Sequence, residues 1–178
     1  MRLCLITLLV VGLSRPVGAT VILPADLGEL SRDAQAIARG RVVAVDAQWT
    51  EGRRTIETIV TLEAEVYLKG QLGATVQFRV PGGTMGRLRN LVVGAPRFAV
   101  GQRVVVFLGV VGPTLPFVLG LNQGVFRVAQ TDQGAWMVSP PPLMPGVFSP
   151  VSRGSATLVP SPLDAFERQV RTIVEGSR

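Results

Sequence analysis

The chain has 178 residues with 18 basic and 12 acidic side chains, no histidine and one cysteine, Cys4. The lack of histidine excludes histidine-ligated zinc sites and the serine–histidine or cysteine–histidine pairs of nucleophilic catalysis. The formal net charge of +6 comes almost entirely from arginine, because Lys69 is the only lysine. We interpret this mild excess as a solvated basic surface and do not expect nucleic acid as the partner.

The N-terminal residues 1–19 have the pattern of a cleavable secretory signal peptide. An apolar run over 3–13 is followed by a small-residue cleavage site, Val17-Gly18-Ala19. The run of about eleven residues is too short for a membrane span, which needs about twenty. We therefore expect a secreted or periplasmic protein that begins at Thr20 and has no membrane span after cleavage. Cys4 is removed with the signal, so the mature chain contains neither a disulfide nor a thiol.

A short N-terminal helix is predicted over residues 27–37, with Asp26 as its N-cap. One face of this helix is apolar at spacings of three, four and three residues, and it carries Leu27, Leu30, Ala34 and Ile37. This spacing is typical of an amphipathic helix, so the apolar face is expected to pack against a sheet.

Two long strands are predicted next, over 37–49 and 54–68, joined by a hairpin tip in which Gly52 takes a positive φ. Even positions from 56 to 68 are mostly apolar and odd positions mostly polar, which indicates a strand with one buried face. A run of β-branched residues argues against the rival helix. A strand of about fifteen residues must coil or bulge, as barrel strands do.

Shorter strands are predicted at 74–80, 103–108, 117–121, 125–129 and 135–138. In the first of them, Val76, Phe78 and Val80 should point inward. The strand at 103–108 is almost continuously apolar, so it should be buried on both faces. A long loop is expected over 81–101. The strands at 117–121 and 125–129 are expected to pair with each other, and 135–138 to form a sheet edge.

These elements predict a mainly β fold: a small five- to six-stranded antiparallel OB-like barrel with a short N-terminal helix and a C-terminal helix. The barrel domain is expected over 20–138. Residues 139–162 are rich in proline, serine and glycine and should be irregular. The C-terminal segment 163–178 should form a helix that Ser161 caps and Gly176 ends.

Several of these segments follow one another in a recognisable order within residues 36 to 128. They are 38–45, 56–70, 74–80, 81–86 and 100–109. The order resembles the OB-fold family that includes netrin-type modules and the tissue inhibitors of metalloproteinases. The family ties its N-terminus to the contact loop with disulfides, and none of those cysteines is present here.

The resemblance implies an exported, non-catalytic binding module whose partner is another protein, such as a secreted protease that it modulates or inhibits. By position, Thr20 would chelate the protease zinc through its α-amino group and carbonyl, and Pro24 would stiffen this segment. Gly82, Gly83, Thr84 and Met85 would form the contact loop. The chain itself is expected to hold no metal in isolation and no cofactor. The alternative is an envelope-associated structural or nucleic-acid-binding OB-fold protein.

We do not expect an enzyme, because acid–base and nucleophilic catalysis need a group poised near neutral pH. The enzymatic interpretation that remains is a hydrolase with a carboxylate pair, which requires two buried acidic groups close together in a cleft. Glu57, Glu63 and Glu65 lie on the polar side of one strand, where an exposed face would not shift their pKa values. We therefore interpret them as a solvated row.

Three other groups have a functional and a structural interpretation. Residues 82–86 could cradle an anion through backbone amides, but they lack the Walker lysine, so a plain loop is favoured. Arginines at 87, 89, 97 and 103 could follow a phosphate backbone, but the phenylalanines needed for base stacking, Phe78, Phe107 and Phe126, are predicted to be core. Trp49, Arg53 and Arg54 are interpreted as an exposed hairpin tip.

Overall fold

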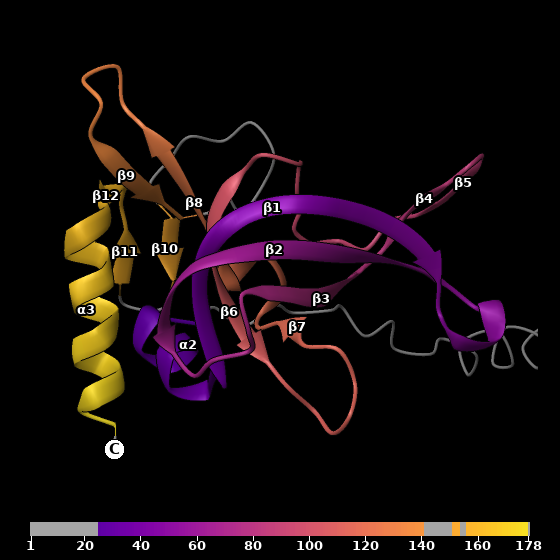
Figure 1. The fold of residues 1–178 in the computed structure, drawn as a ribbon, viewed down its shortest axis with the longest axis horizontal. Helices are drawn as coiled ribbons and strands as arrows, with labels where there is room; N and C mark the ends of the chain where they lie inside the picture. Colours follow the sequence, from indigo (N-terminus) through magenta and orange to yellow (C-terminus); the bar gives the residue numbers. More distant parts are fainter. Residues whose placement is uncertain (1–24, 141–150, 154–155, 178) are drawn as a thin grey trace, which may run out of the picture.

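The computed structural model describes residues 25–140, 151–153 and 156–177 (Figure 1). Five strands form a closed ring, because the last of them pairs back to the first. In ring order these are β1 (Ala36–Trp49), β2 (Ile56–Lys69), β3 (Thr75–Pro81), β7 (Phe117–Val118) and β6 (Arg103–Gly109). The predicted small β-barrel is confirmed, although one neighbouring pair, β3 with β7, is parallel.

The sheet continues beyond the ring through β8 (Val125–Gln130), β9 (Trp136–Ser139) and β12 (Ser161–Pro162). The prediction that the segments containing β7 and β8 pair with each other is wrong. Both pair with β6, one after the other along the same edge of that strand. The 3₁₀ turn at Leu121–Gly124 lies between them and offsets the chain along this edge. β9 is not an edge strand either, since β12 pairs with its outer side.

Short hairpins occupy two regions that were expected to be irregular. Within 81–101, β4 (Gly83–Met85) pairs with β5 (Leu88–Asn90). Within 139–162, β10 (Val151–Arg153) pairs with β11 (Ala156–Leu158), while 141–150 and 154–155 lie outside the described residues. The turn between β1 and β2 is a 3₁₀ segment, Glu51–Arg53, and Gly52 has the predicted positive φ of 76°.

The N-terminal helix α2 (Leu27–Asp33) is shorter than predicted. Asp26 caps it as expected, since its Oδ1 accepts a hydrogen bond of 2.6 Å from the amide of Glu29. The predicted end at residue 37 is wrong because Ile37 already pairs with β6, opposite Phe107. The apolar spacing that predicted a longer helix continues into β1, because α2 and the start of β1 pack against the same core.

The C-terminal helix α3 (Leu163–Glu175) is confirmed, with Phe166, Val170 and Val174 buried on one face. Its predicted cap is wrong: Ser161 belongs to β12, and the N-cap residue is Pro162, which makes no side-chain capping bond. In the described part of the chain, no helix is long and apolar enough to cross a membrane.

β6 separates two apolar cores and contributes to both of them. Val104, Val106 and Leu108 point into the barrel, where Phe78 is also fully buried. The alternate side chains, including Phe107, point outward into a second core beneath α2 and α3. The strand is therefore buried on both faces, as its continuous apolar sequence predicted.

The long hairpin of β1 and β2 is bulged, as its length predicted, and the two strands curve together across the molecule (Figure 1). The register shifts at three places, one of them between Arg39 and Gly40. At buried Gly40 a side chain would collide with the backbone carbonyl oxygen of Glu63. Glycine is required there because the two backbones approach too closely for a Cβ atom.

Lys69, at the end of β2, holds the C-terminal end of α2. Its Nζ donates hydrogen bonds of 2.8 Å to the carbonyl of Ser31 and 2.7 Å to that of Arg32. Burial lowers the pKa of the Lys69 ammonium below its usual value, and the carboxylate of Asp33 opposes this shift. The charged group satisfies helix carbonyls that have no partner within the helix.

Replacing Lys69 by methionine should therefore lower the free energy of unfolding by about 1 kcal/mol, because two carbonyls lose their donor. Urea denaturation would measure the loss. Arg171→Met removes an exposed cation from α3 and should change stability by less than about 0.5 kcal/mol. Equal stability of the two variants would contradict a capping role for Lys69.

Candidate functional site

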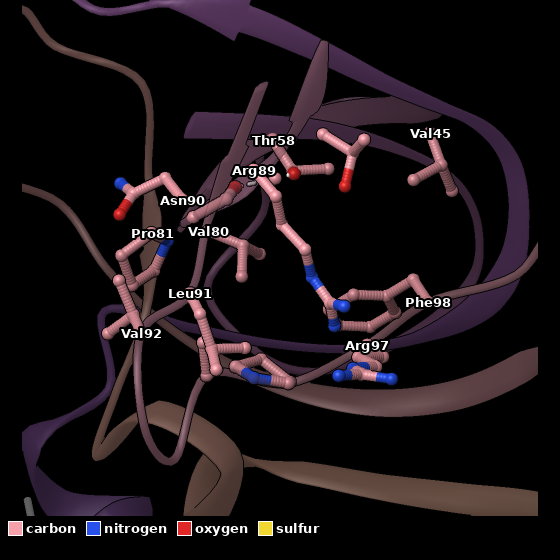
Figure 2. A pocket seen from close by; sticks show the side chains of 15 residues that line it. Val45, Thr58, Val80, Pro81, Arg89, Asn90, Leu91, Val92, Arg97 and Phe98 are labelled. Carbon is pink, nitrogen blue, oxygen red and sulfur yellow. Dashed lines mark hydrogen bonds between the residues drawn. The ribbon is translucent and has the colours of Figure 1, made fainter. Parts of the chain in front are cut away.

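A pocket of about 460 Å³ lies where the β4–β5 hairpin meets one end of the barrel (Figure 2). β1, β2 and β3 contribute Val45, Thr58 and Val80 to its wall. The segment after β5 closes the opposite side with Leu91, Val92, Ala95, Pro96, Arg97 and Phe98. The pocket is therefore built from strands of the ring and from the region between β3 and β6.

Two glycines allow the hairpin to pass close to β2. The amide of Gly82 donates a 3.1 Å hydrogen bond to the carbonyl of Ile56, and its own carbonyl accepts a 2.7 Å bond from Thr58 Oγ1. A Cβ atom on Gly83 would lie 2.8 Å from the same Thr58 oxygen. Asn90 Nδ2 also donates to the carbonyl of Ile56, at 3.1 Å. Residues 82–86 are thus a strand and a tight turn rather than a cradle of free amides.

The structure brings only part of the predicted contact site to this pocket. Gly82, Gly83 and Thr84 line it, whereas Met85 lies in β4 and is absent from the lining. Thr20 and Pro24 lie outside the described residues. The pocket adds residues that the resemblance did not point to, chiefly Arg89, Asn90 and the segment 91–98.

Arg89 and Arg97 both line the pocket, and Figure 2 shows their guanidinium groups reaching to the same side of it, near Phe98. Both side chains belong to exposed residues, and neither forms an ion pair with any described residue. Among the described residues, no acidic side chain lines the pocket. Two guanidinium groups therefore face this space without a compensating carboxylate.

Arg103, which the sequence grouped with these arginines, has a different role. Its Nε is 2.9 Å from Glu65 Oε1, and its guanidinium carbon lies 4.8 Å from the centre of the Trp136 ring. The arginines at 87, 89, 97 and 103 therefore do not form a single basic face. The contact between Arg103 and Trp136 is a cation–π contact.

A signal for the pocket was present in the sequence. Between Glu65 and Asp132 there is no acidic residue, although seven basic residues fall in this stretch: Lys69, Arg79, Arg87, Arg89, Arg97, Arg103 and Arg127. Every residue between β3 and β6 belongs to this acid-free stretch. The charge distribution along the chain, rather than the total charge, marks this end of the barrel as positive.

Two of the three acidic residues of β2, Glu63 and Glu65, form ion pairs with arginines, whereas Glu57 accepts a hydrogen bond from Gln48. Glu65 Oε2 is 2.8 Å from Arg39 Nη1, and Arg39 Nε is 2.7 Å from Glu167 Oε1 on α3. These side chains are between 18% and 26% exposed. The two carboxylates that meet at Arg39 are thus held in ion pairs, Glu65 with Arg103 as well, and neither lines the pocket of Figure 2.

A second pocket of about 370 Å³ lies between α2, α3 and the end of the sheet. Its wall is mainly apolar, and Asp26 is the only carboxylate in it. Among the described residues, no three acidic side chains gather closely enough to hold a metal ion. The prediction that the chain is not an enzyme stays a prediction.

No family model matches the chain, and no curated protein or solved structure matches it. Kinship with the netrin-type modules and the tissue inhibitors of metalloproteinases therefore stays a prediction. It rests on segments such as 56–70 and 74–80, which form β2 and β3.

Proposed function

We propose that this protein is an exported, non-catalytic binding module whose partner is another protein. The contact site would be the pocket of Figure 2 together with the β4–β5 hairpin. The observation that carries this proposal is that apolar residues in and next to the pocket-lining segments are exposed: Leu91, which lines the pocket, is 66% exposed, Leu88 56% and Val93 81%. Clustered exposed apolar residues beside a concave site are typical of protein-binding surfaces.

The hairpin itself supports binding of a protein chain. β4 and β5 form a separate two-stranded sheet, so each keeps one edge without a strand partner. Figure 1 shows this hairpin extending away from the body of the barrel. A free strand edge next to a pocket suits recognition of an extended segment, since the backbone pairs while alternate side chains enter the pocket.

The more specific proposal is that the partner is a secreted metalloprotease, which this chain modulates or inhibits. It rests on the family resemblance and on the placement of Gly82, Gly83 and Thr84 in the pocket wall. A free α-amino group at Thr20 would have a pKa near 8, so a zinc ion could bind its deprotonated form. The zinc would belong to the protease.

Inhibition of purified secreted zinc metalloproteases by the chain that begins at Thr20 would test this proposal. An extra alanine before Thr20 should abolish inhibition, because it displaces the chelating amine. Leu91→Asp with Val93→Asp should weaken binding by about tenfold or more, because it places charges in an apolar contact. Val111→Asp, at a residue 63% exposed on another loop, is the matched control and should have little effect.

The outcomes separate the general proposal from the specific one. Binding that survives the extra alanine but fails in the Leu91 and Val93 variant would exclude chelation and keep the contact site. Binding that survives both changes would exclude the site. Sequencing of the secreted chain should give Thr20 as its first residue, and an intact Met1 would contradict export with cleavage.

The alternative of a nucleic-acid-binding OB-fold has less support. The stacking candidates Phe78, Phe107 and Phe126 are at most 1% exposed, so they are core residues as predicted. Base stacking requires exposed aromatic faces along a basic groove. The basic residues that could supply such a groove are divided, since Arg103 is held by Glu65.

A further inference from the structure

We infer that the pocket of Figure 2 takes an extended acidic segment of a partner protein. A carboxylate of that segment would bind Arg89 and Arg97, and a neighbouring apolar side chain would pack on the pocket wall. The inference rests on the proposed binding function and adds the chemistry of the occupant. It follows from the charge of the pocket, from its apolar wall and from the free strand edge of β5.

Two cations of the pocket, Arg89 and Arg97, have no counter-charge among the described residues. Arg89 comes from β5 and Arg97 from the segment after it, and the fold brings both guanidinium groups to the same side of the pocket (Figure 2). Neither pairs with a described carboxylate, and the lining contains no acidic residue. Like charges at one site repel, and an anion between them removes this cost. Guanidinium groups are suited to carboxylates because their planar donors match the two oxygens.

The rest of the wall selects against a bare anion. Val45, Val80, Leu91, Val92 and Phe98 give the pocket an apolar surface next to the arginines. At about 460 Å³, it is large enough for one or two side chains. The occupant should therefore carry an acidic group and an apolar group close together.

The free edge of β5 indicates an extended shape for the occupant. β5 supplies Arg89 and Asn90 to the pocket, and in the part of the chain that the structure describes it pairs with β4 and with no other strand. An extended segment added to the free edge of β5 would place every second side chain on the pocket side. A segment would fit this geometry if every second residue were acidic or apolar and the residues between them were of any kind.

Selection from a library of short random peptides displayed on phage would test the inference. The target is the chain that begins at Thr20, compared with an Arg89→Gln/Arg97→Gln variant. Arg54→Gln/Arg171→Gln is the control, because it removes the same charge from exposed positions outside the pocket. Selected peptides would then be synthesised and titrated by fluorescence anisotropy, and binding to phosphatidylglycerol vesicles would be measured by co-sedimentation.

We expect selected peptides to be enriched in Asp or Glu next to an apolar residue. The Arg89/Arg97 variant should bind them about tenfold more weakly or worse, since charge-assisted hydrogen bonds are lost. The Arg54/Arg171 variant should bind normally. Because the contact is electrostatic, added salt should weaken it.

Three results would overturn the inference, and they differ in what else they exclude. Selected peptides without acidic enrichment would refute the acidic occupant but leave the binding site in place. Failure to select any peptide would refute the proposed binding site as well. Vesicle binding that depends on Arg89 and Arg97, without peptide binding, would identify an anionic membrane as the occupant instead.

Discussion

Replacing Phe126 by alanine should lower the free energy of unfolding by about 3–5 kcal/mol, the usual cost of deleting a buried phenyl ring. The ring is 1% exposed and lies between two others, with centroids 5.5 Å from Phe107 and 4.9 Å from Phe166. It therefore joins the sheet to α3. A domain of this size is stable by about 5–15 kcal/mol, so the variant would lose a large part of its stability.

Urea denaturation followed by circular dichroism would measure the effect of Phe126→Ala. Leu88→Ala is the control, because Leu88 is 56% exposed and its truncation should cost less than about 0.5 kcal/mol. A loss below about 1 kcal/mol for Phe126→Ala would mean that the second core does not stabilise the folded state as its packing indicates.

Replacing Arg39 by methionine should lower the free energy of unfolding by about 2 kcal/mol, because two partly buried carboxylates lose their shared partner. Glu167 has no other ion pair among the described residues, whereas Glu65 keeps Arg103. Methionine preserves much of the aliphatic stem, so the loss reports mainly on charge. The same change should weaken the contact between α3 and β1, because Glu167 of α3 accepts a hydrogen bond from Arg39 of β1.

A double-mutant cycle with Glu167→Leu would isolate this interaction. If the pair acts as a unit, the double variant should be more stable than the two single losses predict. The control is Arg168 with Asp164, a pair also at 2.8 Å but with side chains 68% and 69% exposed, which should show much weaker coupling because solvent screens it. Equal coupling in the two cycles would contradict a special role for Arg39.

Sequence pattern predicted the long strands and the C-terminal helix well, because each has enough residues to show its period. β2 alternates over its length, and α3 repeats its apolar face three times. β4 and β5 have three residues each, which is too short for an alternation to be recognised. The end of α2 was missed because its apolar spacing continued into a strand that shares its core.

The candidate site was predicted less completely than the fold. The resemblance pointed to Gly82, Gly83 and Thr84, which line the pocket. Arg89 and Arg97 were noticed only as part of a wider arginine group, and Arg103 did not belong with them. Which arginines share a pocket depends on contacts between segments distant in the sequence, and a local pattern does not contain this information. The acid-free stretch between Glu65 and Asp132 was the usable signal.

The closure of the ring has a consequence for how the molecule folds and opens. β1 pairs with β6 from Ala36 opposite Leu108 to Arg41 opposite Arg103, so two segments far apart in the chain must meet. Pairings of such high contact order fold slowly, in milliseconds to seconds for all-β domains. Since β6 also belongs to both cores, neither core is complete before this step. The amide hydrogens of Val104 to Leu108 should therefore exchange with solvent only when the whole domain unfolds.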